Sequence, residues 1–200
     1  MNKMALPKTE SKHPNLTVPD EARNLYSRAF GDLCLVMLLG FGSINLVQPI
    51  LPLVIFELGG DAGLVGLIIA AFSAASVVFR PMMGRFVDDR GDRITLQLGT
   101  IILAVASFAY VAPSLILIAC NRIVHGAAWG AFNTAAASTF TKLAPPSQRG
   151  EAAAIFNVPP AIAQMAMPAI GLALVGVSST STPFILASAM ALSVDRKSVV

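Results

Sequence analysis

Charged residues are scarce in this chain of 200 residues. They make up 12% of it, whereas apolar residues make up 55%. In soluble proteins about a quarter of the residues are charged, and the mean hydropathy here is +0.71. Several apolar runs approach the roughly 20 residues that one helix needs to cross a bilayer. Because lipid offers no partner to unpaired backbone groups, the sequence predicts an all-α, polytopic integral membrane protein.

Residues that bind metals or act as nucleophiles are also scarce. The chain has two histidines and two cysteines, too few and too scattered for a metal site. Cys34 and Cys120 fall in separate predicted spans at different depths, so we expect two buried thiols and no disulfide. The chain has no P-loop and no Ser/His/Asp grouping at a plausible depth. We therefore expect no enzyme activity, no cofactor and no metal.

Basic residues alternate with uncharged connections along the chain. The connections at 56–63, 113–114 and 176–183 contain no lysine or arginine. By the positive-inside rule, this pattern places the N-terminus in the cytoplasm and the protein in the plasma (bacterial inner) membrane. The net charge of +3 is spread in this way, which argues against nucleic acid as a partner. The basic residues outside the predicted spans are Lys3, Lys8, Lys12, Arg23, Arg28, Arg80, Arg85, Arg90, Arg93, Lys142 and Arg149.

The apolar runs predict a cytoplasmic tail at 1–28 and a transmembrane bundle at 29–194. The last helix would span only about 18 Å, too little to cross. The basic end, 195–200, differs in kind from the rest, so we expect a non-native tail on a fragment; a genuine basic cytoplasmic end is the alternative. The expected helices cover about 33–56, 64–83, 94–112, 115–143, 151–177 and 183–194, the last incomplete.

A charged segment, Gly84–Arg93, separates two apolar runs and is expected to be a short cytoplasmic loop. Gly84 and Gly91 would permit a tight backbone. Asp88 could accept hydrogen bonds from a helix N-terminus or from an arginine. This pattern suggests a tight turn with a charge latch, and the alternative is a merely solvated loop. The candidate latch residues, called the gating candidates below, are Gly84, Asp88, Asp89, Arg90, Gly91 and Arg93.

Arg122 is the lysine or arginine that lies deepest in a predicted span, about 12 Å below the outer surface. A charge there costs at least ~2.5 kcal/mol unless it faces a cavity or a partner. His125 lies one turn away on the same face, and imidazole titrates near neutral pH. Asp32, at the inner mouth of the first span, is the nearest acid, although a direct pair with Arg122 is not expected. All three are candidate site residues, and a role in substrate binding or proton coupling is what the family resemblance described below implies. Structural roles are the alternatives: a backbone or hidden-carboxylate partner for Arg122, a satisfied hydrogen bond for His125 and an interfacial site for Asp32.

Neutral polar and small residues complete the set of candidates. The polar ones either line a cavity or form interhelical hydrogen bonds worth about 0.6 kcal/mol each. They are Asn45, Gln48, Asn133, Asn157 and Gln164. Such a sparsely polar lining favours an amphipathic or apolar substrate over a sugar or a multiply charged anion. Small residues allow helices to approach closely, and the helix-packing candidates are Gly126, Gly130, Pro168 and Gly171.

Three motifs resemble those of the major facilitator superfamily. Gly84, Asp88, Gly91 and Arg93 match the family's loop pattern Gly-x-x-x-Asp-Arg-x-Gly-Arg-Arg/Lys, whereas Asp89 and Asp92 stand where the family usually has basic residues. Arg122, followed four residues later by Gly126, resembles its helix 4 motif. Pro168 and Gly171 echo the helix 5 motif of its drug/proton antiporters. The resemblance covers about 29–194.

The resemblance implies the N-terminal six-helix half of a twelve-helix transporter. In this family the loop is thought to clasp the opposite half, and the helix 4 arginine to serve substrate binding or proton coupling. We therefore expect a secondary active transporter that exports a small amphipathic compound by proton antiport and alternating access. Its partners would be membrane lipid, the substrate, protons and the missing C-terminal half. The alternatives are an uptake symporter and a non-transporting scaffold or remnant.

Overall fold

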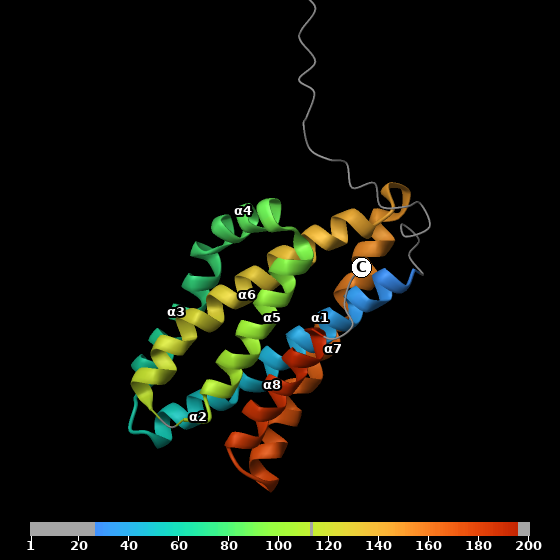
Figure 1. The fold of residues 1–200 in the computed structure, drawn as a ribbon. Coiled ribbons are helices and arrows are strands. Elements are labelled where there is room, and N and C mark those ends of the chain that lie inside the picture. The colour runs from blue at the N-terminus through green and yellow to red at the C-terminus, as the bar shows by residue number, and fades with distance from the viewer. Residues whose placement is uncertain (1–26, 113, 196–200) are drawn as a thin grey trace, which may run out of the picture.

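The computed structural model describes residues 27–112 and 114–195 (Figure 1). This part of the chain is helical and contains no strand, which confirms the predicted all-α class. Of the expected tails at 1–28 and 195–200, residues 1–26 and 196–200 lie outside the described residues, whereas Arg28 begins α1 and Asp195 ends α8. The helices are α1 (Arg28–Val47), α2 (Ile50–Glu57), α3 (Ala62–Val78), α4 (Arg80–Arg90), α5 (Asp92–Ala109), α6 (Leu115–Leu143), the short 3-10 helix η2 (Pro146–Gln148), α7 (Arg149–Val177) and α8 (Ser181–Asp195).

Four segments of the described chain are long and apolar enough to cross a membrane. They are Arg28–Glu57, which joins α1 and α2, together with α5, α6 and Pro146–Val177. The bent pair α3 and α4 gives a fifth span if it is counted as one, and α8 is a shorter apolar helix. These lengths and compositions are those of a multi-pass membrane protein.

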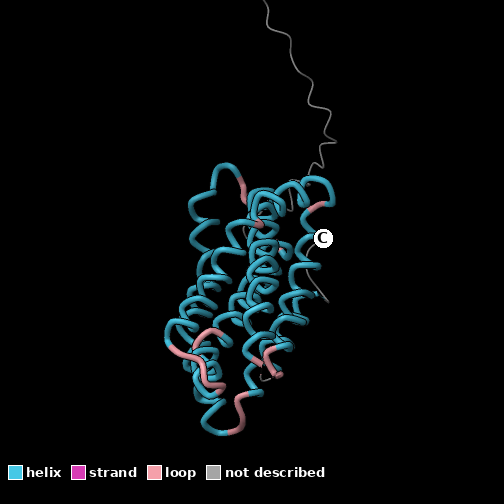
Figure 2. The backbone as a smooth tube through the Cα atoms, turned by 90° about the vertical axis from the view of Figure 1, so that its left-hand side faces the viewer, coloured by secondary structure: helices cyan, strands magenta, loops and turns pink. Residues whose placement is uncertain are grey.

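The helices pack in an order that differs from their order in the chain. α6 lies between α3 and α5, α5 packs against α8, and α1 packs against both α8 and α7. In Figure 1, α3 and α4 therefore lie on one side of the bundle and α7 on the other. Figure 2 shows the same helices lying lengthwise beside one another in a view turned by 90°.

Short polar side chains begin several of these helices. The Ser27 hydroxyl accepts a hydrogen bond from the Phe30 backbone N–H, and the Asp61 carboxylate accepts one from Leu64 at 2.8 Å. These side chains satisfy backbone donors that have no partner inside the helix. Glu151 lies in the first turn of α7, where a negative charge stabilises the positive end of the helix dipole.

The first expected helix, 33–56, is interrupted in the structure. α1 ends at Val47 and α2 begins at Ile50, with Pro49 as the residue that precedes α2. Proline has no N–H to donate to the preceding turn, so the helix breaks there.

The expected loop at 84–93 is also wrong, because most of this segment is helical. α4 continues to Arg90, α5 begins at Asp92, and Gly91 alone separates them with φ +87°. A side chain rarely tolerates this φ, which explains the glycine. Gly84 lies within α4, and a Cβ added there would meet no atom within 4 Å. A charged composition does not prevent a helix where its side chains reach solvent, and α4 lies at one end of the bundle (Figure 1).

Glycines allow α6 to approach its neighbours at backbone distance. Gly126 lies directly against the Phe72 carbonyl oxygen of α3, and a Cβ added to Gly130 would lie 2.9 Å from the Ser76 carbonyl oxygen. On another side of α6, a Cβ added to Gly99 of α5 would lie 3.1 Å from the Phe132 nitrogen. Larger side chains at these points would force the helices apart.

The two cysteines are free, and their exposure differs from the expectation. Cys34 is half-buried, but Cys120 is exposed. The expected burial of Cys120 was wrong because no helix of the described chain covers its side of α6, as the exposed Ile123 and Val124 also show.

We predict that Gly126→Ala destabilises the protein by about 1–3 kcal/mol, because the new methyl group collides with a backbone atom that cannot rotate away. Gly66→Ala in α3 is the matched control. It has open space around it and should be neutral or stabilising by up to about 1 kcal/mol. The unfolding midpoint in detergent measures both, and equal midpoints would contradict the close approach of α3 and α6.

Candidate functional site

Arg122 lies inside the bundle, where α3, α5 and α6 meet. Its side chain is 2% exposed. The guanidinium carbon Cζ lies 4.9 Å from the ring centre of Phe72 and 5.7 Å from that of Tyr110, the residue that ends α5. Ring faces attract cations and offset part of the cost of burial. The Nε of Arg122 is buried and has no hydrogen-bond partner among the described residues.

His125 joins the same cluster from the next turn of α6 and is fully buried. Its Nδ1 lies 3.0 Å from the Tyr110 hydroxyl oxygen, and its ring meets the Phe72 ring edge-on at 5.7 Å. The other ring nitrogen, Nε2, is buried without a partner in the described part of the chain. If the tyrosine donates to Nδ1, then Nε2 carries the proton and becomes a second donor without an acceptor.

Among the described residues, the cluster contains a cation but no anion. Within the described ranges no acid forms an ion pair with Arg122. Asp32 is half-buried near the start of α1, and no hydrogen bond joins it to the cluster. The structure therefore brings Arg122 and His125 together and leaves Asp32 apart. A buried charge without a counter-ion is costly, so this cluster is suited to receive an anionic group.

The sequence reasoning missed Phe72 and Tyr110. A signal for Tyr110 was available, because the chain has only two tyrosines and a tyrosine in an apolar segment usually needs a partner for its hydroxyl. Phe72 carries no comparable signal, since an apolar ring in an apolar helix is indistinguishable from a core residue.

The neutral polar candidates bond mainly to their own helices. Asn45, Asn133 and Asn157 each donate from Nδ2 to the backbone oxygen four residues earlier, at 2.8, 2.9 and 2.7 Å. These contacts are not the interhelical bonds that we considered as an alternative. Gln48 and Gln164 are exposed. Each asparagine keeps its carbonyl oxygen and one N–H available for another group.

The other glycine and proline candidates lie on α7. A Cβ added to Gly171 would lie 2.7 Å from the Leu46 carbonyl oxygen of α1, so these two helices also approach at backbone distance. Pro168 lies inside α7, which continues through it.

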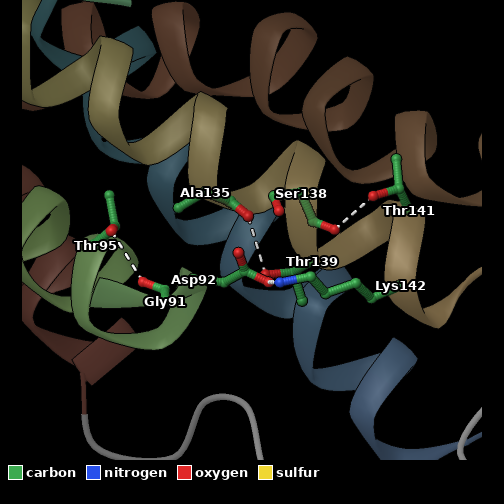
Figure 3. A network of polar contacts seen from close by, with 8 residues as sticks. All are labelled: Gly91, Asp92, Thr95, Ala135, Ser138, Thr139, Thr141 and Lys142. Carbon is green, nitrogen blue, oxygen red and sulfur yellow. Dashed lines mark hydrogen bonds and ion pairs between the residues drawn. The ribbon is translucent and has the colours of Figure 1, made fainter. Parts of the chain in front are cut away.

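The gating candidates lie near an ion pair. This pair is at the end of the bundle that the sequence analysis assigns to the cytoplasm. Asp88, Asp89, Arg90 and Arg93 are exposed. Asp92, by contrast, is 13% exposed and its Oδ2 lies 2.6 Å from Lys142 Nζ, in the last turn of α6 (Figure 3). Each charge also stabilises the helix end on which it lies. Asp92 is thus held within the bundle.

Figure 3 shows how the backbone around this pair is fixed. The Thr95 hydroxyl donates to the Gly91 carbonyl oxygen at 3.0 Å, next to the positive φ that separates α4 from α5. The Thr139 hydroxyl donates to the Ala135 carbonyl oxygen of α6 at 2.9 Å. Both hydroxyls are therefore satisfied within their own helix or its cap.

Comparison with known proteins gives a family and two kinds of relative. Residues 33–194 match the sequence profile of the Major Facilitator Superfamily. The Quinolone resistance protein NorA of Staphylococcus aureus (strain Mu50 / ATCC 700699) is 26% identical over 112 residues, which cover 56% of this chain and 29% of that protein. The Tetracycline resistance protein, class E, of Escherichia coli is 28% identical over 152 residues, which cover 74% of this chain and 37% of that protein. The chain thus spans about a third of the length of these curated relatives.

We predict that Asp92 and Lys142 are energetically coupled by about 0.5–1 kcal/mol, the upper range for a partly exposed pair. Asp92→Asn, Lys142→Met and the double variant form the mutant cycle, with unfolding in detergent as the measurement. Asp92→Asn should cost more than Lys142→Met, because Asp92 is the less exposed partner. High salt should reduce the coupling. Strictly additive effects at low salt would contradict it.

Proposed function

The chain belongs to the Major Facilitator Superfamily, the family whose motifs it resembles, and we propose that it forms part of a secondary transporter that exports a small amphipathic compound in exchange for protons. The family is one of transporters, and the apolar helices make the chain an integral membrane protein. We place the N-terminus in the cytoplasm and the protein in the bacterial inner membrane, on the distribution of lysine and arginine.

The cluster around Arg122 is the observation that carries the proposal. Charged side chains inside membrane spans are expensive and usually belong to substrate or ion pathways. Arg122 is buried beside His125, and both have an unused nitrogen. We propose that an anionic group, from the substrate or from an acid elsewhere in the complete transporter, occupies these donors during part of the cycle. Proton binding to that acid would then compete with the arginine.

The names of the relatives support export as the direction of transport. They are called resistance proteins for quinolones and for tetracyclines, and export from the cell is a direct way to confer such resistance. A sparsely polar set of side chains in the spans agrees with an amphipathic substrate. By alternating access, the bundle would rock against a second half, with the substrate bound between them.

We further propose that the exposed charges at the end of α4 act as a cytoplasmic latch. Asp88, Asp89 and Arg90 lie in the last turn of that helix, and Arg93 is the second residue of α5. Because Asp92 is already paired with Lys142, these four are the charged gating candidates that remain available to a second half. They would hold the cytoplasmic side shut in the outward-open state.

We predict that inverted membrane vesicles containing the complete gene product accumulate ethidium when respiration acidifies their interior, and that a protonophore abolishes the accumulation. Arg122→Ala should lower the rate at least about tenfold, as for the loss of a charge-assisted hydrogen bond. Arg149→Gln, an exposed arginine at the start of α7, should leave the rate unchanged. Accumulation only in right-side-out vesicles would indicate uptake, and no flux in either would favour a non-transporting protein.

A second prediction concerns the latch. Asp88→Asn should lower transport about two- to fivefold while leaving membrane insertion unchanged, because it removes one exposed charge-assisted contact. Glu57→Gln, an exposed acid at the end of α2, is the control. Initial rates in the same vesicles, normalised to protein amount, are the measurement, and unchanged transport in Asp88→Asn would count against the latch.

A further inference from the structure

Tyr110, at the C-terminal end of α5, is held beside His125 by contacts from two other helices. Its hydroxyl oxygen lies 3.0 Å from His125 Nδ1, and its side chain is 2% exposed. One turn earlier in α5, the Ala106 carbonyl oxygen accepts a hydrogen bond of 2.7 Å from Asn121 Nδ2 of α6. The Tyr110 ring also packs against Phe184 of α8, with ring centres 5.6 Å apart. The position of the hydroxyl is therefore fixed by both α6 and α8.

The contact between Tyr110 and a neutral His125 can form in two ways. In the first, the hydroxyl donates to Nδ1 and the imidazole carries its hydrogen on Nε2. In the second, Nδ1–H donates to the hydroxyl oxygen. The tyrosine hydrogen then has no acceptor, and Nε2 has no donor, in the part of the chain that the structure describes. The first arrangement leaves one buried group unpaired and the second leaves two. Each unpaired group costs free energy, so tyrosine is favoured as the donor.

The charge of Arg122 favours the neutral form of the imidazole. The two side chains of α6 share a ring of α3, because Arg122 Cζ lies 4.9 Å from the Phe72 ring centre and the His125 ring centre lies 5.7 Å from it. A proton added to the imidazole would place a second cation beside the first, and like charges repel strongly where little water is present.

No acid from the neighbouring helices offsets this repulsion among the described residues. The titratable side chains around the imidazole are Tyr110 of α5 and Arg122 of α6. α3 and α8 contribute only rings to this cluster. Glu57 at the end of α2 and Asp61 before α3 are exposed. The surroundings of His125 are therefore those of a hydrogen-bond donor and not those of a group that gains and loses a proton.

We infer that Tyr110 is a positioning residue that fixes His125 as a neutral donor through Nε2–H, and that a group other than His125 carries the exchanged proton. This inference rests on the proposed function and assigns the histidine one part in it. Arg122 Nε and His125 Nε2 are both buried without a partner in the described ranges. They offer two N–H groups to one anionic group. When that group takes up a proton it loses its charge, and both donors hold it less tightly.

The tautomer is tested by solid-state NMR of the complete, purified protein in lipid, with the histidine nitrogens isotopically labelled. The signal of His125 is the one that His125→Gln removes. Its Nε2 should carry a hydrogen and its Nδ1 none throughout about pH 5 to 8, the range in which a free histidine titrates. Tyr110→Phe keeps the ring but removes the hydroxyl, so a form with hydrogen on Nδ1 should appear. A His125 signal that titrates in the unchanged protein would overturn the inference.

Transport in the inverted vesicles gives a second readout. His125→Gln keeps an N–H donor but cannot gain a proton, so it should lower the rate only about threefold and leave its pH profile unchanged. His125→Leu removes the donor and should lower the rate at least about tenfold, as for a bond to a charged group.

The hydroxyl of Tyr110 is tested in the same vesicles. Tyr110→Phe should lower the rate about fivefold and add a new pH dependence near neutrality, because the imidazole is no longer fixed. Thr100→Val is the matched control in α5. It removes a buried hydroxyl that bonds only to the Gln97 carbonyl oxygen of its own helix, at 2.8 Å, and should change neither the rate nor the pH profile. An unchanged pH profile in Tyr110→Phe would count against the positioning role.

The two proposals fail in different ways. If His125 keeps its hydrogen on Nε2 and no vesicle orientation shows flux, the positioning role stands and the proposed transport is wrong. If proton-driven, Arg122-dependent flux is present but His125→Gln abolishes its dependence on the proton gradient, the histidine carries the proton. The transporter then stands and the inference is wrong.

Discussion

In lipid, two apolar helices gain little from hiding apolar surface, so their association depends on how closely their backbones can approach. In this bundle that approach is concentrated on α6. Gly126 and Gly130 bring it against carbonyl oxygens of α3, and Gly99 brings α5 against the backbone of α6 at Phe132. The position of every functional candidate on α6 follows from these contacts. The side chains of α6 that face neither α3 nor α5 are the ones that remain partly exposed.

The same constraint explains why the polar groups of the bundle divide into two kinds. Most hydroxyls and amides bond to a carbonyl oxygen of their own helix or its cap, which satisfies them without help from a neighbour. Arg122 and His125 do not follow this rule, since each keeps a buried nitrogen without a partner in the described chain, and the Ser43 and Ser107 hydroxyls are likewise buried and unpaired there. A buried charge is far more costly than a buried hydroxyl, and this is why the transport proposal is built on the cluster around Arg122.

Charge at the end that we assign to the cytoplasm also has two roles. Asp92 and Lys142 join the ends of α5 and α6, each at the helix end that its charge stabilises. The remaining charges of α4 are exposed and can act on something outside the bundle. From composition alone, the whole segment Gly84–Arg93 is predicted to be one gating loop. The ion pair separates the charge that belongs to the fold from those that are available for a partner.

The sequence by itself determined the membrane class, the all-α fold class and the family, because hydropathy and the loop and helix 4 motifs are local properties of the chain. It also singled out Arg122, since a charge within an apolar run is visible without a structure. Only the tertiary structure decided that Phe72 and Tyr110 surround this arginine, that Asp92 pairs with Lys142 and that Cys120 is exposed. These facts depend on which side of each helix faces a neighbour. That choice is made by contacts between segments far apart in the chain, and no local pattern records it.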